Sequence, residues 1–193
     1  MSRDYLEQDA TQMRRADRAV DDEAWIKTFL HRAAVGAFAT LHGDQPFVNT
    51  NLFVYDEDSN SIIAHTARVG RTRANIEVHD KVCFSIMEMG RLLPADEALE
   101  FSVEYAGVTV FGSVEIINDE AEATAALQLL LDKYAPHLKP GSDYRPPVPD
   151  ELRRTSVFRL NIESWSGKKK EVASDFPGAF LFDYKPVLET NND

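Results

Sequence analysis

Residues 46–84 read PFVNTNLFVYDEDSNSIIAHTARVGRTRANIEVHDKVCF, and this stretch decides the fold. Its first ten residues alternate between two faces, which predicts a strand over 46–55. A turn at 56–60 leads into a second strand, predicted over 61–66. Because a parallel crossover needs a dozen or more residues, these short spacings predict an antiparallel meander.

Further apolar or alternating runs predict four more strands, over 35–41, 81–89, 101–117 and 156–163. The third of these is long, and we expect a bend or break in it at Gly107 or Gly112, since glycine inside a strand often marks such a point. The lysine run that follows the last strand is typical of a solvated turn. The pattern as a whole predicts a mainly β fold, α+β by content: a six-stranded antiparallel β-barrel with peripheral helices.

Three segments predict these helices. An amphipathic helix is expected over 21–33, where acidic residues at its start favour the helix dipole. A short helix is expected over 72–79, with Thr72 as its cap. A third, over 119–134, begins with the spacing of a capping box. The proline-rich stretch 136–149 predicts an extended loop.

The length of 193 residues suits one domain. We expect a polar arm over 1–20, a domain over 21–174 and a C-terminal tail over 175–193 that the pattern does not place. The net charge of −11 disfavours nucleic acid and anionic membranes as partners, although a small anionic ligand needs only a local cluster of donors. No apolar leader or span of about 20 apolar residues is found, so we expect a cytoplasmic protein.

Several kinds of site have no support in the sequence. It contains no dinucleotide-binding glycine fingerprint, no P-loop and no nucleophile elbow. The five histidines form no i,i+4 pair, and we predict no metal site. The single cysteine, Cys83, excludes an intrachain disulfide and is interpreted as a small buried apolar residue.

The segment from His65 to Arg73 carries three arginines in an otherwise acidic chain. It follows a predicted strand and opens a predicted helix, and its glycine permits close backbone approach, which favours an anion cradle. Arginine adds fork-shaped donors that match phosphate oxygens. The alternative is a solvated loop whose arginines pair with nearby carboxylates, and the residues alone leave both open.

Asn49, Thr50 and Asn51 interrupt an otherwise apolar strand. Such a polar row is what a strand lining a polar ligand would need. A patch that only faces solvent explains the same residues equally well.

These features together resemble a known family. A polar-interrupted strand, a Tyr-Asp turn, a strand ending in His-Thr-Ala and a Gly-Arg segment opening a helix resemble the FMN-binding split barrels of the pyridoxamine 5'-phosphate oxidase-like superfamily, closest to its nitroimidazole-resistance-like branch. The sequences YAGVTVFGSV at 105–114 and IESWSG at 162–167 resemble later strands of these proteins. The resemblance covers about residues 20–170.

The resemblance implies a split β-barrel that binds FMN at the interface of a homodimer. Arg71 and Thr72 would hold the phosphate, with Arg73 or Arg68 assisting. The residues expected along the ribityl chain and the ring are His65, Thr66, Ala67, Val48, Asn49, Thr50 and Asn51, with Trp165 and Lys168 approaching from the partner subunit. After Gly167 the chain reads KKKEVASDF, without the Arg-x-His-Asp-Arg pattern that grips pyridoxal phosphate in true oxidases, so that activity is not implied.

Three functions follow as hypotheses. The first is an FMN-dependent oxidoreductase acting on a small molecule, either nitroreductase-like or related to the pyridoxamine-phosphate oxidases. In this hypothesis His65 is a proton donor or substrate contact, with a purely structural histidine as the alternative. The second is a non-catalytic binding module for FMN, haem or a deazaflavin. The third is an interaction domain without a ligand.

Overall fold

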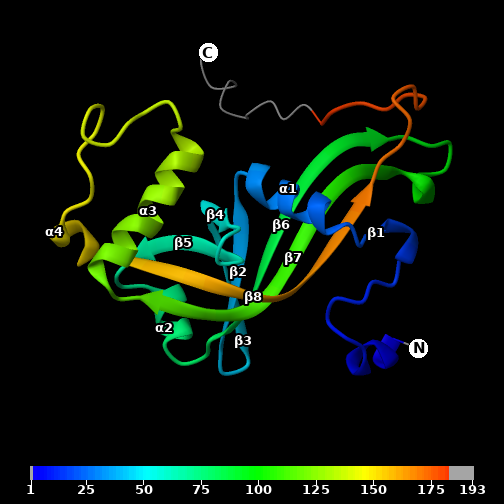
Figure 1. Cartoon of the computed structure of the whole chain (residues 1–193). Helices are drawn as coiled ribbons and strands as arrows, with labels where there is room; N and C mark the ends of the chain where they lie inside the picture. Colours follow the sequence, from blue (N-terminus) through cyan, green and yellow to red (C-terminus); the bar gives the residue numbers. More distant parts are fainter. Residues whose placement is uncertain (1, 183–193) are drawn as a thin grey trace, which may run out of the picture.

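Eight antiparallel strands form one curved sheet in the computed structural model, which describes residues 2–182 (Figure 1). The strands are β1 (Ala19–Val20), β2 (Gly36–His42), β3 (Gln45–Asn51), β4 (Phe53–Asp56), β5 (Ser61–Ala67), β6 (Lys81–Leu93), β7 (Ser102–Ile117) and β8 (Thr155–Lys170). The α-helices are α1 (Glu23–Arg32), α2 (Arg71–Ile76), α3 (Glu120–Tyr134) and α4 (Pro149–Leu152). Short 3₁₀ turns cover Ser2–Glu7, Ala16–Arg18 and Ala98–Glu100.

The strand order is β3-β2-β6-β7-β8-β5-β4, with β1 paired to β8. The two edge strands, β3 and β4, are joined only by Leu52, so the sheet curls until its edges meet without pairing. This arrangement confirms the predicted split barrel. The predicted count of six strands was too low. The run over 46–55 breaks into two strands at Leu52, and the N-terminal arm contributes β1.

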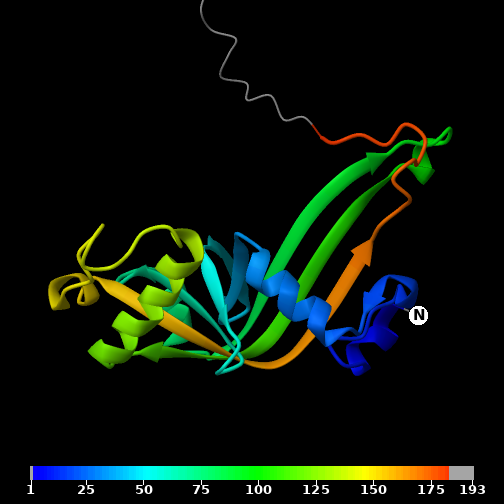
Figure 2. The same ribbon diagram turned by 45° about the horizontal axis from the view of Figure 1, so that its top comes forward.

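Of the three longest strands, β6 and β8 extend beyond their predicted ends, whereas β7 keeps its predicted bounds within one residue. The three together form an extension that curves away from the barrel, called here the β6–β8 extension (Figures 1 and 2). β6 continues to Leu93, and β8 runs through the lysine run to Lys170 rather than turning there. Residues 164–170 of β8 pair with residues 105–111 of β7, so neighbouring backbone overrides the weak strand preference of lysine and glycine.

A bulge bends the long strands where the barrel meets the β6–β8 extension. The register between β7 and β8 shifts between Phe111 and Gly112, where Phe111 pairs with Ser164 and Gly112 with Ile162. A Cβ at Gly112 would lie 2.0 Å from the carbonyl oxygen of Asn161. The irregularity expected at Gly112 is therefore present as a bulge, within a strand that remains continuous.

Two apolar clusters hold the fold together. The larger fills the barrel beneath α1 and includes Phe84, which contacts both Phe38 and Phe53 edge to face. The smaller lies between α3 and the outer surface of β4, β5 and β8. Both covering helices begin at aspartate caps, as the acidic and capping-box patterns indicate: Asp22 accepts from Ala24 N, and Asp119 from Glu122 N.

Two predicted helix boundaries were wrong. Gly70, not Thr72, precedes the first residue of α2, and the helix ends at Ile76. The Thr72 side chain is buried and bonds within the fold instead of capping. At the end of the proline-rich loop, Pro149 starts the short helix α4, since proline is tolerated in a first turn.

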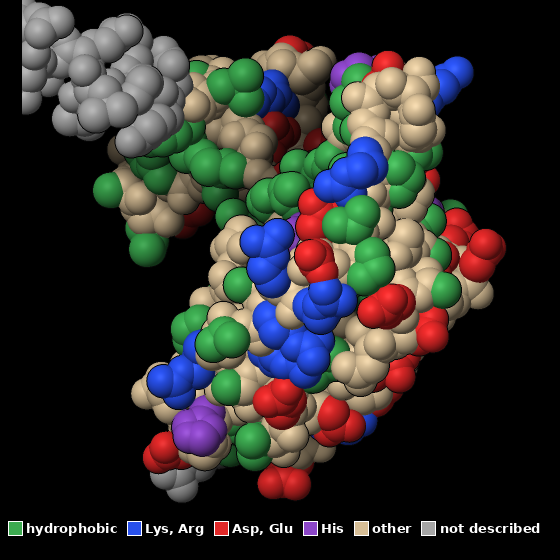
Figure 3. Space-filling view, turned by 90° about the vertical axis from the view of Figure 1, so that its left-hand side faces the viewer, with side chains coloured by type: hydrophobic (Ala, Val, Ile, Leu, Met, Phe, Trp, Pro, Cys, Tyr) green, Lys and Arg blue, Asp and Glu red, His purple; other side chains and the backbone are tan. Residues whose placement is uncertain are grey.

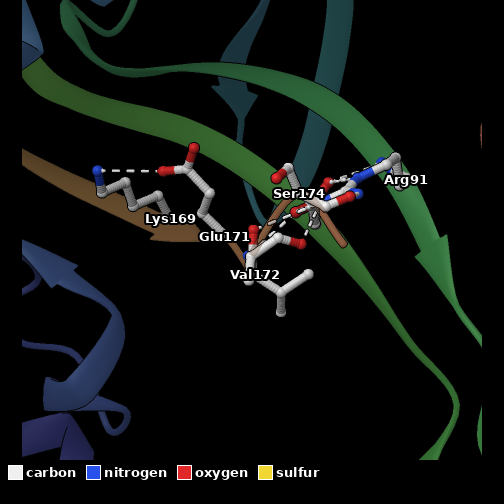
Figure 4. A network of polar contacts seen from close by, with 7 residues as sticks. Arg91, Lys169, Glu171, Val172 and Ser174 are labelled. Carbon is white, nitrogen blue, oxygen red and sulfur yellow. Dashed lines mark hydrogen bonds and ion pairs between the residues drawn. The ribbon is translucent and has the colours of Figure 1, made fainter. Parts of the chain in front are cut away.

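Arg91 and Glu104 hold the C-terminal segment against the β6–β8 extension. Figure 4 shows Arg91 beside Val172 and Ser174. Arg91 binds the Glu104 carboxylate through Nε and one terminal nitrogen, both at 2.8 Å. Its guanidinium also donates to the carbonyl oxygens of Val172, Ala173 and Ser174. Further along, Leu92 and Phe180 exchange two backbone hydrogen bonds. Residues 183–193 of the predicted tail lie outside the described residues.

The attachment of the C-terminal segment is expected to depend on pH. Hydrogen bonds from Arg91 and from Val172 N lower the pKa of Glu104 from 4.5 to about 2. A lowered carboxyl pKa contributes stability that is present above the unfolded value and lost as the pH falls through the folded one. We therefore expect protease cleavage near Val172 to accelerate between pH 4.5 and 2, measured with an acid-active protease. Glu104→Gln should already be cleaved rapidly at neutral pH, and equal resistance of both proteins would contradict this role.

No helix among the described residues is long and apolar enough to cross a membrane.

Candidate functional site

The barrel is open along a seam between the ends of β3 and β5. β4 pairs with β5 only as far as Ala64, opposite Phe53, and β3 pairs with β2 alone. We define the seam by residues 49–51 on one side and 65–67 on the other. Backbone groups that have no strand partner along these edges can bind an extended ligand.

One amide side chain of β3 crosses the seam, and a second binds helix α2. Asn51 Nδ2 donates to the carbonyl oxygen of His65 at 3.2 Å, and Asn49 Nδ2 donates to Thr72 Oγ1 at 3.3 Å. Asn51 Oδ1 is buried and has no hydrogen-bond partner within the described part of the chain. A buried acceptor without a partner is uncommon, and a ligand N–H is one group that could satisfy it.

Strand alternation separates the four residues predicted along β3. Asn49 and Asn51 face the seam, whereas Val48 and Thr50 point to the opposite surface, beside Ala39 and Ala37 of β2. The Val48 side chain is 60% exposed there. The polar row read from the sequence is therefore divided between two surfaces, and Val48 and Thr50 can serve the seam only through their backbones.

Helix α2 closes the barrel end beneath the seam (Figure 1). Its side chains bind three strands: Thr72 to Asn49 of β3, Asn75 Nδ2 to Thr40 Oγ1 of β2 at 2.9 Å, and a terminal nitrogen of Arg73 to Ser156 Oγ of β8 at 3.0 Å. Arg73 also pairs with Glu77 at 2.7 Å. Thr72 and Arg73 are thus part of the scaffold, and Arg73 in particular is already engaged.

Unlike that of Arg73, the guanidinium groups of Arg68 and Arg71 have no bond to the rest of the described protein. Both side chains are exposed, and neither makes an ion pair or a side-chain hydrogen bond within the described residues. They flank the start of α2, where Gly70 supplies no side-chain cap for the first backbone N–H groups. Of the predicted phosphate ligands, these two arginines are the ones free to bind an anion.

His65, Thr66 and Ala67 alternate along the other side of the seam. His65 pairs with Val157 on the surface that α3 covers, whereas Thr66 pairs with buried Ser156 on the barrel side. Desolvation by the surrounding strands lowers the pKa of His65 from its usual value of 6.5. His65 is therefore neutral at pH 7, a state suited to hydrogen bonding or to accepting a proton.

Trp165 and Lys168 lie far along β8 from Thr155–Val157, the residues that pair with the 65–67 side of the seam. Nine residues of β8 separate Trp165 from Ser156, about 30 Å of strand at roughly 3.3 Å per residue. Trp165 packs against the barrel core with its ring 6.5 Å from that of Tyr55. Lys168 lies 5.4 Å from the Tyr105 ring. Within this chain, Trp165 and Lys168 therefore contact Tyr55 and Tyr105 rather than residues 65–67.

The cysteine, the possible metal ligands and two residues that were not predicted remain to be described. Cys83 is half-buried, and burial raises the pKa of its thiol, so it is not an activated nucleophile. The described residues hold no group of three or more metal-ligating side chains. Ser156 and Arg153, near the barrel end, were not predicted as site residues. Only the pairing of Ala67 with Thr155 brings the start of β8 beside residues 68–70, the loop that follows β5.

The pyridoxamine 5'-phosphate oxidase family model matches residues 22–169, from α1 through β8. The chain belongs to this family. A comparison with curated proteins found no match. The family match includes every residue of the seam and of α2, so the resemblance expected from the sequence is confirmed.

Solved structures share the oxidase-family fold of this chain. The flavocytochrome Anf3 from Azotobacter vinelandii has a TM-score of 0.75 and 24% identity, over 93% of this chain and 87% of that chain. An FAD and haem binding protein from Mycobacterium smegmatis has a TM-score of 0.72 and 20% identity, over 80% and 74%. A Bacteroides thetaiotaomicron protein named for 5-nitroimidazole antibiotic resistance has a TM-score of 0.64 and 18% identity, over 79% and 90%.

Proposed function

We propose that this chain binds a flavin along the seam and acts as a flavin-dependent oxidoreductase on a small molecule. The proposal is supported by membership of the oxidase family and by two relatives in fold whose names state a flavin. A bound flavin supplies the electron transfer, while the protein supplies binding, orientation and exclusion of water.

The observation that carries the proposal is the pair of unpaired guanidinium groups at Arg68 and Arg71. In a chain of net charge −11, exposed arginines are expected to find carboxylates, and these two have none among the described residues. Arg68 directly follows β5, which forms one side of the seam, and Arg71 is the first residue of α2. We assign Arg71 to the flavin phosphate, with Arg68 beside it, because a guanidinium fork matches phosphate oxygens.

The remaining seam residues would orient the flavin. Asn51 offers an acceptor without a partner, and the backbone of residues 65–67 offers strand-edge donors and acceptors. Neutral His65 would act as a hydrogen-bonding group or proton acceptor rather than as a cationic acid at pH 7. These contacts involve the part of the cofactor that FMN and FAD share, and FMN is the smallest flavin that satisfies them.

We also propose that the protein works as a homodimer. The outer surface of β2 and β6 carries small residues such as Ala37, Ala39 and Ser85, which the register places side by side. Exposed apolar side chains border them: Val48 is 60% and Met87 65% exposed. An uncovered apolar surface favours burial against a second copy. A second copy is also what would bring Trp165 and Lys168 to the seam.

The test is the visible spectrum of the purified protein, before and after incubation with FMN or FAD and removal of the excess. We expect a two-banded flavin spectrum that remains with the protein, bleaching when NADH or NADPH is added. Light scattering on the same sample should give the mass of two chains. A retained flavin that neither nucleotide reduces would favour a binding module. A Soret band would indicate haem, and a colourless protein would contradict flavin binding.

A further inference from the structure

Cations gather at both ends of β8. Figure 3 shows Lys and Arg side chains on the face of the molecule where α2 and α4 lie, which is the end where β8 begins. A second group lies where the strand ends, on the β6–β8 extension. There the pairing of Ala19 with Lys168 brings Arg18 of the N-terminal arm beside the lysine run 168–170. A chain of net charge −11 thus carries a cationic group that the proposed flavin phosphate site does not include.

Tyr105 is the centre of this second group. Arg18 donates to its hydroxyl oxygen at 3.3 Å, and the amine of Lys168 lies 5.4 Å from its ring. Lys170 pairs with Tyr105 across the sheet, so their side chains share one face, and its amine donates to Ser102 Oγ. We call Arg18, Tyr105, Lys168 and Lys170 the Tyr105 cluster.

Two hollows adjoin the Tyr105 cluster, and Lys170 belongs to the lining of both. The first, of about 460 Å³, lies between the N-terminal arm and β8 and has Arg18 in its lining. The second, of about 560 Å³, includes Met89 and Tyr105. Met89 pairs with Tyr105 in the sheet and is 48% exposed. The thioether and the tyrosine ring form an apolar wall of the kind that a planar base packs against, next to the cations.

The carboxylates around the cluster do not neutralise its cations. Lys168 and Lys170 form no ion pair within the described part of the chain. Arg18 reaches the carboxylate of Asp17 only at 3.9 Å. Both oxygens of that carboxylate accept closer hydrogen bonds from Arg15, at 2.7 and 2.5 Å. The other carboxylates that line the hollows are each in an ion pair: Glu88 with Arg32, Glu104 with Arg91 and Glu171 with Lys169. The cluster therefore keeps a positive charge that an anion can offset.

We infer that the Tyr105 cluster binds the 2′-phosphate of NADPH, so that NADPH rather than NADH reduces the flavin. This inference rests on the proposed function, because it names the electron donor of the seam. The two nucleotides differ only in this phosphate, which carries about two negative charges and whose oxygens accept hydrogen bonds from ammonium and guanidinium groups. The adenine would pack against Met89 and Tyr105, and such a wall favours a nucleotide over a bare phosphate ion. The proposed homodimer is what would bring this end of β8 to a flavin.

The first experiment measures binding without any flavin chemistry. The full chain is titrated calorimetrically with adenosine 2′,5′-bisphosphate and with AMP, which lacks the 2′-phosphate. We expect the bisphosphate to bind about tenfold or more tightly, as one charge-assisted hydrogen bond provides. Lys170→Gln should bring the two affinities within about threefold of each other, whereas Lys170→Arg, which keeps the charge, should retain the preference. Lys139→Gln, at an exposed lysine of the proline-rich loop, is the matched control and should leave both affinities unchanged.

The second experiment uses the flavin-loaded protein under anaerobic conditions. Bleaching of the flavin is followed after mixing with NADPH or NADH over a range of concentrations. NADPH should reach half of its maximal bleaching rate at a concentration about tenfold or more below that of NADH. This difference should shrink in Lys170→Gln and in Arg18→Gln, because each variant removes one cation from the cluster.

The outcomes distinguish this inference from the proposed function. Equal affinities for the bisphosphate and AMP, or a preference that survives in Lys170→Gln, would overturn the Tyr105 cluster as a phosphate site while leaving the flavin seam intact. A bisphosphate preference combined with equal bleaching by NADH and NADPH would overturn NADPH as the occupant. A protein that binds the bisphosphate through Lys170 but retains no flavin would contradict the proposed function itself. Should Lys170→Gln fail to fold, Arg18→Gln makes the same test from the N-terminal arm.

Discussion

Replacing Arg71 with alanine is expected to weaken flavin binding ten- to a hundredfold. The exposed guanidinium of Arg71 has no ion-pair partner among the described residues, so its removal takes away a charge-assisted bond to the ligand and no bond within the protein. Such a bond contributes about 1.5–3 kcal/mol, which corresponds to this change in affinity. The measurement is fluorescence quenching of FMN or FAD during titration of the flavin-free protein.

Two further variants make this result interpretable. Arg71→Lys should lose part of the affinity, because lysine keeps the charge but not the fork of donors. Arg14→Ala removes an equally exposed arginine from the N-terminal arm and should change nothing. If Arg71→Ala binds flavin as tightly as the unmodified protein while it melts at the same temperature, the phosphate assignment is wrong.

Replacing Gly112 with alanine is expected to destabilise the fold by about 3 kcal/mol or more, which corresponds to a fall of about 6–12 °C in Tm for a chain of this size. The new Cβ would lie 2.0 Å from the carbonyl oxygen of Asn161 and 3.0 Å from Leu160 Cδ1. The nearer obstacle is backbone of the paired strand, which cannot move aside without breaking the β7–β8 register at the bulge. Thermal unfolding followed by circular dichroism measures the effect.

Gly70→Ala is the matched control for stability. No atom lies within 4 Å of a Cβ built at Gly70, whose φ of 165° is extended backbone. This variant is expected to melt within a few degrees of the unmodified protein. If Gly112→Ala is equally stable, the strands can repack at the bulge and the close approach is not a constraint.

The segments that could be predicted are those whose side chains alternate between a buried and an exposed face. β2 and the barrel half of β6 show this pattern, and their predicted bounds agree with the structure within a few residues. The same alternation implied that Asn49 and Thr50 point to opposite surfaces, although the polar row suggested a common role. The pairing of Arg73 with Glu77, four residues later, was also visible as a helical spacing, and it engages the Arg73 guanidinium within the protein.

Other features depend on contacts that a local pattern does not contain. The break at Leu52 separates two edge strands whose places in the sheet are set by pairing with β2 and with β5, and the continuation of β8 to Lys170 depends on the neighbouring residues of β7. Arg153 joins the site only because Ala67 pairs with Thr155, 88 residues later in the chain. Local propensity carries no information on such long-range pairings.

The position of β8 in the sheet has a consequence for how the chain folds. β8 lies between β5 and β7 and also pairs with β1, where Ala19 meets Lys168 about 150 residues further along. The loop-closure entropy of these pairings has to be overcome before their contacts stabilise the sheet, which slows folding into the range of milliseconds to seconds. During synthesis, β5 remains an unpaired edge on one side until residue 161 has left the ribosome. We therefore expect the barrel to form once β8 has emerged rather than strand by strand, with the nascent chain exposed to aggregation until that strand arrives.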